Sequence, residues 1–289
     1  MPMKTILLTG SHGQVGYELK RSLQGLGRVI APTRDALDLS SESSIQSCLS
    51  NYSPDLIINP AAFTAVDAAE NQHDEAYAIN ARAPALFADY AARWKIPLIH
   101  YSTDYVYSGD GDQPWREDAP CVPQNVYGAS KLAGEEAIRA SGCAHLILRT
   151  SWVYGSRGKN FLLTMLRLGK ERSQLSIIDD QFGAPTWCRT LADLTCHIIA
   201  SQPDWQAVTG TYHLANSGVT TWYGFAEAIF RIASEAGVAA PELIAIPASQ
   251  YPLPAKRPHN SRLNLDKFTH TFGLTPPDWQ AALRMCMAE

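Results

Sequence analysis

Short apolar runs alternate with longer segments of helical period along the first half of the chain. Because the runs are apolar at successive positions, they are typical of strands that are covered on both faces of a sheet. Strands that alternate with helices in this way predict a parallel sheet built from βαβ units. The predicted strands are residues 5–9, 28–31, 37–39 (a weaker one), 56–58, 98–101 and 146–148, and the predicted helices are residues 15–23, 43–49, 75–94 and 128–140.

The pattern loosens after about residue 150, where proline-rich segments such as 247–258 separate the later elements. Helices are expected at residues 161–170, 191–199 and 221–237, and a short strand at 212–214. We therefore predict an α/β protein with a Rossmann-type doubly wound parallel sheet and a smaller C-terminal substrate-binding region. The NAD(P)-binding domain should span residues 1–150, and residues 151–289 should form mainly the substrate-binding region, interleaved with the first.

Composition narrows the possible functions. An apolar share of 46% suffices for a core, and 18% charged residues is too few for a disordered chain. A net charge of −4 gives no electrostatic footprint for nucleic acid or membrane, and no apolar run approaches the roughly 20 residues that span a bilayer. Residues 1–9 lack the long apolar segment of a secretory signal. Six widely spaced cysteines without a Cys-x-x-Cys pair indicate reduced thiols in a cytoplasmic protein rather than disulfides or a zinc site.

A glycine-rich loop from Gly10 to Gly16 follows the first predicted strand and opens the first predicted helix. Its spacing is G-x-x-G-x-x-G, with Gln14 and Val15 between the last two glycines. Glycines allow a tight turn and let backbone N–H groups approach a pyrophosphate at the positive end of the helix. At a βα junction the pattern favours dinucleotide binding by Gly10, Gly13, Gln14, Val15 and Gly16, with a plain tight turn as the alternative.

The end of the second predicted strand bears on the choice of cofactor. An NAD-preferring site usually has an acid there to bond the ribose 2′-hydroxyl, but no carboxylate precedes Asp35. The guanidinium of Arg34 can instead bond the 2′-phosphate of NADP, unless Arg34 is only a solvated loop charge. We therefore expect NADPH as the cofactor, without excluding NADH, and we place Asp38 and Leu39 near the adenine.

A Tyr-x-x-x-Lys pair, Tyr127 and Lys131, lies on a predicted helix. Residues four apart share one face of a helix, so the phenol and the ammonium can converge on one site. A neighbouring cation favours the phenolate, and we expect Lys131 to bring the pKa of Tyr127 from about 10 toward neutrality. The same ammonium can bond the nicotinamide ribose. Thr103 ends an apolar strand and places a hydroxyl within reach of the same carbonyl, so the three residues predict carbonyl reduction.

Several blocks, which extend over essentially the whole chain, resemble the dTDP-4-dehydrorhamnose reductase family of the extended short-chain dehydrogenase/reductase superfamily. The blocks are residues 13–16, 59–67, 100–106, 125–128, 149–154, 180–186 and 257–263. The resemblance implies NAD(P)H-dependent reduction of the C4 ketone of a dTDP-sugar by the catalytic residues Thr103, Tyr127 and Lys131. It also implies cofactor contacts by Ala62, Phe63, Thr64, Tyr101, Tyr127 and Lys131, and contacts with the sugar nucleotide by Val66, Thr103, Asp104, Tyr105 and Trp152.

The resemblance also implies a mechanism. Tyr127 protonates the carbonyl oxygen as the nicotinamide delivers hydride to C4, while Lys131 tunes Tyr127 and Thr103 supplies a hydrogen bond. Trp152 offers a flat apolar face to the methyl group of a deoxysugar, with a place in the core as the alternative. Arg257 is a candidate to meet the diphosphate, with surface solvation as the alternative.

Other functions occur on the same fold. A nucleotide-sugar dehydratase resembles Ser-Thr-Asp-Glu at this point and needs the Glu to remove a proton, but here Tyr105 follows Asp104. An epimerase or another nucleotide-sugar reductase is harder to exclude. A non-catalytic NADP-binding regulatory subunit, as in methionine adenosyltransferase, also resembles this fold. The intact set of Thr103, Tyr127 and Lys131 favours an enzyme over a regulator.

We expect no metal, and either a monomer or a metal-independent homodimer. Some relatives in the family dimerise through a magnesium ion held by glutamates of both subunits. Arg189 stands at the position of one such glutamate, and a guanidinium has no lone pair to offer magnesium. Glu18 remains at the place of a second ligand, but a single carboxylate holds the ion weakly. The alternatives are that Arg189 pairs with Glu18 across another interface or is solvated.

Overall fold

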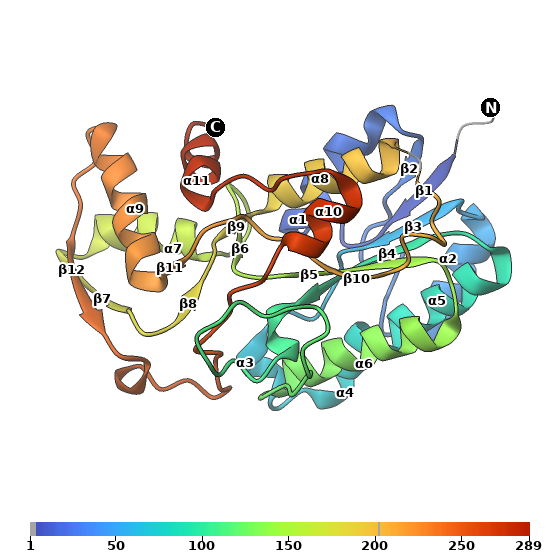
Figure 1. Ribbon diagram of the computed structural model, residues 1–289, viewed down its shortest axis with the longest axis horizontal. Helices are drawn as coiled ribbons and strands as arrows, with labels where there is room; N and C mark the ends of the chain where they lie inside the picture. The colour runs from blue at the N-terminus through green and yellow to red at the C-terminus, as the bar shows by residue number, and fades with distance from the viewer. Residues whose placement is uncertain (1–3, 202) are drawn as a thin grey trace.

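The computed structural model describes residues 4–201 and 203–289, so Met1, Pro2 and Met3 of the N-terminal stretch lie outside the described residues. Within those ranges the main element is a sheet of six parallel strands in the order β10-β5-β4-β3-β1-β2 (Figure 1). The strands are β1 (Thr5–Leu8), β2 (Arg28–Ile30), β3 (Leu56–Asn59), β4 (Leu98–Thr103), β5 (His145–Thr150) and β10 (Gly210–His213). The predicted Rossmann-type fold is confirmed.

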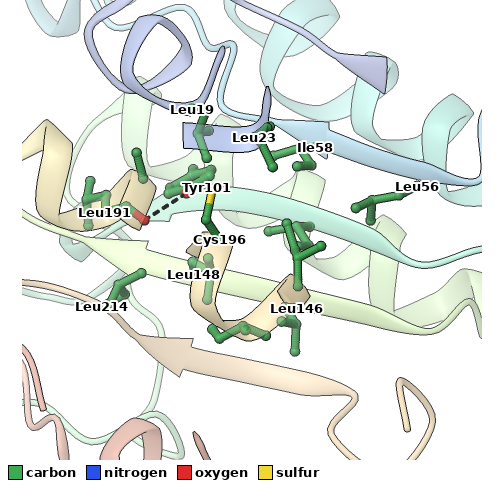
Figure 2. Close-up of a cluster of buried hydrophobic side chains, with 14 of the residues drawn as sticks. Leu19, Leu23, Leu56, Ile58, Tyr101, Leu146, Leu148, Leu191, Cys196 and Leu214 are labelled. Carbon is green, nitrogen blue, oxygen red and sulfur yellow. Dashed lines mark hydrogen bonds between the residues drawn. The ribbon is translucent and has the colours of Figure 1, made fainter. Parts of the chain in front are cut away.

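Side chains alternate across the sheet, which therefore has a hydrophobic layer on each face. In β1, Ile6 and Leu8 belong to one layer and Leu7 to the other. The first layer, shown in part in Figure 2, is covered by α1 (Gln14–Ser22), α8 (Cys188–Ala200) and α10 (Asp266–Phe272), and the second by α2 (Glu42–Tyr52), α5 (Ala83–Trp94) and α6 (Val126–Ser141). Burial on both faces explains why the strands are apolar at successive positions.

The remaining elements form a smaller region, drawn on the left of Figure 1. In the described part of the chain it consists of β6 (Val153–Tyr154) paired with β9 (Thr186–Trp187), β7 (Gln174–Ile178) with β12 (Glu242–Ile246), β8 (Phe182–Gly183) with β11 (Thr220–Thr221), and the helices α7 (Phe161–Glu171), α9 (Trp222–Glu235) and α11 (Trp279–Met287). These helices share a second core around Phe225. β10, α8 and α10 also come from beyond residue 150, yet they pack in the main sheet and its first layer. Among the helices of the described ranges, none has the length and apolar character needed to cross a bilayer.

One sequence expectation about strands is wrong, and one group of strands was not expected. Residues 37–39, all of them described, form no strand; they lead toward α2 while Asp38 Oδ1 accepts hydrogen bonds from the Ser40 N–H and hydroxyl. Such local side-chain bonds compete with a sheet ladder. The paired strands of the smaller region were not predicted: four of them have only two residues and carry no periodic pattern, and the five-residue strands β7 and β12 were also missed.

The single helix predicted over residues 75–94 is divided into α4 (His73–Tyr77), the π-helix η2 (Ala78–Arg82) and α5. Pro84 stands four residues after Asn80 and has no N–H to donate to the Asn80 carbonyl, so the helical ladder changes register here. The side chain of Asn80 is fully buried between the segment after β3 and α6. The other short elements are α3 (Val66–Ala69) and the 3₁₀ helices η1 (Leu23–Gly25), η3 (Asp104–Val106) and η4 (Ala248–Gln250).

Candidate active site

The carboxyl ends of β1, β3 and β4 meet at one edge of the parallel sheet, where ligands of such sheets bind. The loop after β1 turns at Gly10, whose φ is +57°, and the Gly13 N–H donates to the Gly10 carbonyl over 2.9 Å. A Cβ on Gly16 would lie 2.1 Å from that carbonyl oxygen, so only glycine lets α1 start this close to the loop. The N–H groups at the start of α1 therefore form a cradle for an anion such as a pyrophosphate.

A cavity of about 180 Å³ opens beside this loop. It is lined by the loop and by Arg34, Asp38, Leu39 and Ala62, four of the residues predicted to contact the cofactor. The Arg34 side chain is 84% exposed, and its Nη2 lies 3.5 Å from Glu75 Oε1. An exposed pair of this kind is weak, so the guanidinium is free to meet a phosphate at the mouth of the cavity.

Other residues predicted along the cofactor have additional structural contacts. Gln14 Oε1 accepts a hydrogen bond of 2.8 Å from Asn160 Nδ2, which ties the loop to the start of α7. Val15 packs against the hydrophobic cores on both sides of this junction. Phe63 is fixed through its backbone N–H and C=O by the side chain of Asn80, and Thr64 is exposed.

The side chain of Tyr101 lies in the first hydrophobic layer rather than in the cavity. Its hydroxyl donates to the Leu191 carbonyl of α8 over 3.5 Å (Figure 2). The same hydroxyl lies 2.7 Å from Thr195 Oγ1, also on α8. The backbone carbonyl of Tyr101 instead accepts a hydrogen bond of 2.6 Å from Lys131 Nζ. The contribution of Tyr101 to the site is therefore through its backbone.

The helix that carries Tyr127 and Lys131 packs closely on its neighbours through two glycines. A Cβ on Gly128 would lie 2.2 Å from the Tyr105 carbonyl oxygen, and a Cβ on Gly134 would lie 2.1 Å from the Asn80 carbonyl oxygen. Because both positions are glycine, α6 can lie directly against η3 and η2. This approach brings the Tyr-x-x-x-Lys pair to the end of β4.

Lys131 is 1% exposed, although it carries an amine. Its Nζ donates to the Tyr101 carbonyl and lies 3.2 Å from His100 Nε2. Burial lowers the pKa of Lys131 to about 8, while Glu135 one turn further along α6 has the opposite effect. The amine can therefore change its protonation state close to neutral pH.

Burial raises the pKa of Tyr127 to about 12, with the Thr103 hydroxyl acting to lower it and the Asp104 carboxylate to raise it. This direction is opposite to the shift toward neutrality that the neighbouring ammonium was expected to cause. The ring of Tyr105 stands edge-on to that of Tyr127, with centroids 5.5 Å apart. A phenol that stays protonated at neutral pH is suited to donate a proton, which is what reduction of a ketone requires.

Thr103 and Asp104 are held firmly where β4 ends. Thr103 Oγ1 donates to Asp104 Oδ1 over 3.1 Å and accepts the Tyr105 N–H over 3.2 Å, which caps η3. Burial raises the pKa of Asp104 to about 6, while hydrogen bonds from Ser261 and Thr103 act to lower it. The structure thus brings Thr103, Asp104, Tyr105 and Tyr127 together, as the sequence predicted.

A groove of about 510 Å³ borders Tyr105 on the side of the smaller region. Its lining includes Tyr105, Trp152, Phe161, Trp222, Tyr251 and Arg257. Trp152 has a φ of +49° and stacks on Trp222, with ring centroids 3.7 Å apart and planes at 13°. A Cβ on Gly183 would lie 2.7 Å from the same indole. Trp152 therefore forms part of an aromatic wall instead of presenting a free face.

Arg257 lines the groove, but its guanidinium already has partners. Its Nη2 lies 2.8 Å from Asp67 Oδ2, and its Nη1 donates to the Ala255 carbonyl over 3.2 Å. Asp67 is on α3, next to Val66, which is half-buried and lies beside the groove rather than in its lining. A diphosphate at Arg257 would therefore share the guanidinium with Asp67.

Asn59, His100 and Asn80 were not predicted as part of the site, although each is completely buried around α6. Asn59 Nδ2 lies 3.1 Å from His100 Nδ1, and Asn80 Nδ2 donates to Ser130 Oγ over 3.0 Å. Asn59 and His100 do carry a signal, since they are polar residues in strands that are otherwise apolar. The signal of Asn80 is the proline four residues later.

The parallel sheet, the glycine cradle and the Thr103, Tyr127 and Lys131 cluster at one edge define an oxidoreductase of the extended short-chain dehydrogenase type, which uses a nicotinamide cofactor. Comparisons with known proteins refine this class. The family model described as the RmlD substrate binding domain matches residues 3–289. The chain is 48% identical to dTDP-4-dehydrorhamnose reductase of Escherichia coli (strain K12), over 98% of this chain and 97% of that protein.

Solved structures agree with this match. The crystal structure of dTDP-4-dehydrorhamnose reductase from Bacillus anthracis in complex with NADP is similar, with a TM-score of 0.91, 33% identity, and coverage of 100% of this chain and 99% of that one. The corresponding enzyme of Clostridium acetobutylicum has a TM-score of 0.91 and 34% identity, with 98% of both chains covered. The chain belongs to the dTDP-4-dehydrorhamnose reductase family.

Proposed function

We propose that this protein reduces the C4 ketone of dTDP-4-dehydro-β-L-rhamnose with NADPH and so forms dTDP-L-rhamnose. The observation that carries the proposal is the placement of Thr103 at the end of β4, with Tyr127 and Lys131 of α6 beside it and next to Tyr105, which lines the groove. The family supports the substrate, since relatives such as those of Escherichia coli and Burkholderia thailandensis, which match this chain over nearly their full length, are named dTDP-4-dehydrorhamnose reductase.

The residues present suit a dinucleotide. A Cβ on Gly16 would collide with the Gly10 carbonyl, so glycine at this position keeps the start of α1 against the loop, where its backbone N–H groups can meet a pyrophosphate. Gly10, Gly13 and Gln14 would hold the pyrophosphate, Arg34 the 2′-phosphate, and Asp38 with Leu39 the adenine side. Ala62, Phe63 and Thr64, together with the backbone of Tyr101, would flank the nicotinamide half, whose ribose Lys131 would bond. NADPH supplies a hydride to the ketone carbon when bound.

Within this arrangement each catalytic residue has a separate task. Tyr127 donates its proton to the oxygen of the ketone, and burial keeps the phenol protonated until that moment. The Thr103 hydroxyl, which donates to Asp104 Oδ1, would turn its proton to the same ketone oxygen and stabilise the charge that develops on it. Lys131 holds the cofactor ribose and supplies positive charge beside Tyr127.

On the substrate side, Asp104 and Tyr105 would meet the sugar and Arg257 the diphosphate. The stacked pair of Trp152 and Trp222 would form the apolar wall that faces the sugar methyl group. We further propose that residues 1–150 supply the cofactor domain and that residues 151–289 supply mainly the substrate region. The six free cysteines support a reducing, cytoplasmic location.

The direct test is the loss of NADPH absorbance when the purified protein is mixed with dTDP-4-dehydrorhamnose, with dTDP-L-rhamnose identified as the product by mass spectrometry and NMR. Oxidation of NADPH that requires this sugar nucleotide is expected. A protein that binds NADPH tightly but leaves the ketone unchanged would instead be a non-catalytic regulator. A product with inverted carbon centres and no net NADPH consumption would indicate an epimerase.

We also propose that activity and assembly need no divalent metal. Arg189 Nε lies 3.1 Å from Glu18 Oε2 in the same chain, and the guanidinium also pairs with Glu289. This pair within one chain supports the proposal, since it occupies the carboxylate that a metal would need. We expect the same turnover and the same sedimentation coefficient with EDTA and with added Mg²⁺. An activity that chelator removes and Mg²⁺ restores would contradict the proposal, as would a metal-dependent change of mass.

A further inference from the structure

A row of buried polar side chains runs beneath the catalytic lysine, from the end of β1 across β3 to β4. Thr9 Oγ1 donates to Asn59 Oδ1 over 2.6 Å, and Asn59 Nδ2 lies 3.1 Å from His100 Nδ1. His100 Nε2 in turn lies 3.2 Å from Lys131 Nζ. Asn59 and His100 are direct partners in the ladder between β3 and β4, and the four residues are each 1% exposed or less. Buried polar groups of this kind are retained at a cost, which calls for a role.

The hydrogen bonds of this row have a defined direction. Thr9 Oγ1 accepts the Ala61 N–H over 3.4 Å, so its own proton points to Asn59 Oδ1. The amide NH₂ of Asn59 therefore faces His100 Nδ1, which must act as an acceptor. Burial, with Lys131 as a second cause, lowers the pKa of His100 well below its usual value, so the ring is neutral. A neutral imidazole with a bare Nδ1 carries its proton on Nε2, directed at Lys131.

An N–H that points at Lys131 distinguishes the two forms of its amine. The ammonium is a donor without a lone pair, so it faces the His100 Nε2–H donor to donor. The neutral amine has a lone pair and can accept that N–H, while it still donates to the Tyr101 carbonyl. The row thus favours the neutral amine over the ammonium.

We propose that His100 is a positioning residue that makes Lys131 a proton store for Tyr127. After Tyr127 has given its proton to the sugar oxygen, an N–H bond of the Lys131 ammonium breaks and the O–H bond of Tyr127 forms again. The lone pair left on the amine then accepts the Nε2–H of His100, and a proton from solvent later restores the ammonium. The inference rests on the proposed function, because it concerns the proton that ketone reduction consumes.

The other ionisable groups that act on Lys131 and Tyr127 come from α6, β4, β5 and η3. On α6 itself, Tyr127 lies one turn before Lys131 and Glu135 one turn after it. Glu135 acts to raise the pKa of Lys131, but Arg149 of β5 pairs with this carboxylate at 2.6 Å and offsets much of its charge. Asp104 of η3 acts on Tyr127, and His100 is the group that β4 contributes. His100 is therefore the neighbour whose removal should change the proton affinity of Lys131 most directly.

The test is the pH dependence of kcat/KM for dTDP-4-dehydrorhamnose at saturating NADPH. In the unchanged protein, the rate should fall as the pH rises through about 8, where Lys131 loses its proton. His100→Phe removes the N–H that opposes the ammonium, so the pKa of Lys131 should rise. The pH at which kcat/KM falls should therefore increase by about one unit, which corresponds to the free energy of about one hydrogen bond. On the low-pH side of the profile, kcat/KM should be roughly ten-fold lower than in the unchanged protein, since the neutral amine of Lys131 loses the hydrogen bond from His100.

His145→Phe is a matched control. His145 is also a buried histidine in a strand of the same sheet, but its Nδ1 is bonded to the Cys143 carbonyl at the far end of β5. This variant should keep the pH profile of the unchanged protein. If His100→Phe lowered kcat/KM but left the pH at which it falls unchanged, His100 would have only a structural role and the proposal would be wrong.

If His100→Phe does not fold, two further measurements still test the proposal. The side chain of Asn59→Asp has the same shape, but its carboxylate accepts a hydrogen bond from the Nδ1–H of His100. The imidazole then presents the Nε2 lone pair to the Lys131 ammonium, so kcat/KM should again fall only at a higher pH. In the unchanged protein, ¹⁵N NMR of the histidine side chains should show His100 with a bare Nδ1 and a protonated Nε2. The opposite tautomer would overturn the proposal. The NMR result does not depend on substrate, so it separates failure of this inference from failure of the proposed function.

Discussion

The cavity beside the glycine loop and the groove along Trp152 and Trp222 differ in what encloses them. One side of the cavity is the glycine loop, where the backbone itself faces the ligand site and Gly10 and Gly16 approach each other so closely that one added carbon on Gly16 would collide. The groove is bounded by large side chains from α7, α9 and the segments between the short strands. Backbone positions are set by the sheet and cannot relax, whereas stacked side chains can repack around a ligand.

This difference indicates that cofactor binding and substrate recognition depend on different parts of the structure. A nicotinamide dinucleotide is the same molecule in every enzyme that uses it, and a rigid cradle suits it. The sugar nucleotide must be distinguished from similar ones, and a wall of aromatic side chains can be altered without disturbing the sheet. Between the two, Tyr127 and Lys131 lie on α6 and belong to neither wall.

The largest effect, on turnover, is expected from a substitution that changes neither the cavity nor the groove. Tyr127→Phe keeps the ring and its edge-on contact with Tyr105 but removes the proton donor. Turnover should fall by roughly 10²–10⁴-fold, while the dissociation constant of NADPH stays within a factor of about two. Steady-state kinetics and fluorescence titration measure the two quantities. Tyr52→Phe, an exposed tyrosine of α2, is the control and should change neither. Near-normal turnover in Tyr127→Phe would remove this residue from the mechanism.

The backbone-built cavity should tolerate no addition. Gly16→Ala places a Cβ 2.1 Å from the Gly10 oxygen, so α1 must move away from the loop. Overpacking of this kind costs about 1–3 kcal/mol, and NADPH affinity should fall by roughly 10- to 100-fold. Gly25→Ala is the matched control, because no atom lies within 4 Å of the added carbon. Equal NADPH affinities in the two variants, measured by calorimetry, would show that the loop does not hold the cofactor.

The aromatic groove should respond more mildly and only on the substrate side. Trp222→Ala removes the ring that stacks on Trp152. Stacking is worth about 0.5–1.5 kcal/mol, so KM for the sugar nucleotide should rise by roughly two- to ten-fold with NADPH affinity unchanged. Trp94→Ala, an exposed tryptophan at the end of α5, is the control. If Trp222→Ala weakened NADPH binding instead, the division between the two walls would be wrong.

The smallest effect is expected at the mouth of the cavity. Arg34 is exposed and is held by a single weak ion pair, so Arg34→Ala should not affect folding. The KM for NADPH should rise by roughly three- to five-fold, since an exposed pair between charges is worth little, while the KM for NADH stays the same. The ratio of the two values measures recognition of the 2′-phosphate. Equal changes with both cofactors would mean that Arg34 does not contact it.

Much of the fold and part of the site follow from local patterns. The strand runs, the glycine loop and the helix with Tyr127 and Lys131 were predicted because each depends on neighbours in sequence. The π-helix that holds Asn80 was predicted as plain helix, although Pro84 is the local cause of the break. The paired strands of the smaller region were missed, since each has only a few residues and depends on a partner far along the chain.

The sequence by itself determined the order of the strands and helices around the main sheet, the glycine loop of Gly10, Gly13 and Gly16, and the shared face of Tyr127 and Lys131. These features follow from turn geometry and helical spacing, which operate over a few residues. Only the tertiary structure decided the chemical state of the site. His100 meets Lys131 across 31 residues, and burial keeps Tyr127 protonated where spacing alone had indicated the opposite shift. The reason is that a pKa depends on solvent exclusion and on every charge nearby, and both are set when distant segments pack together.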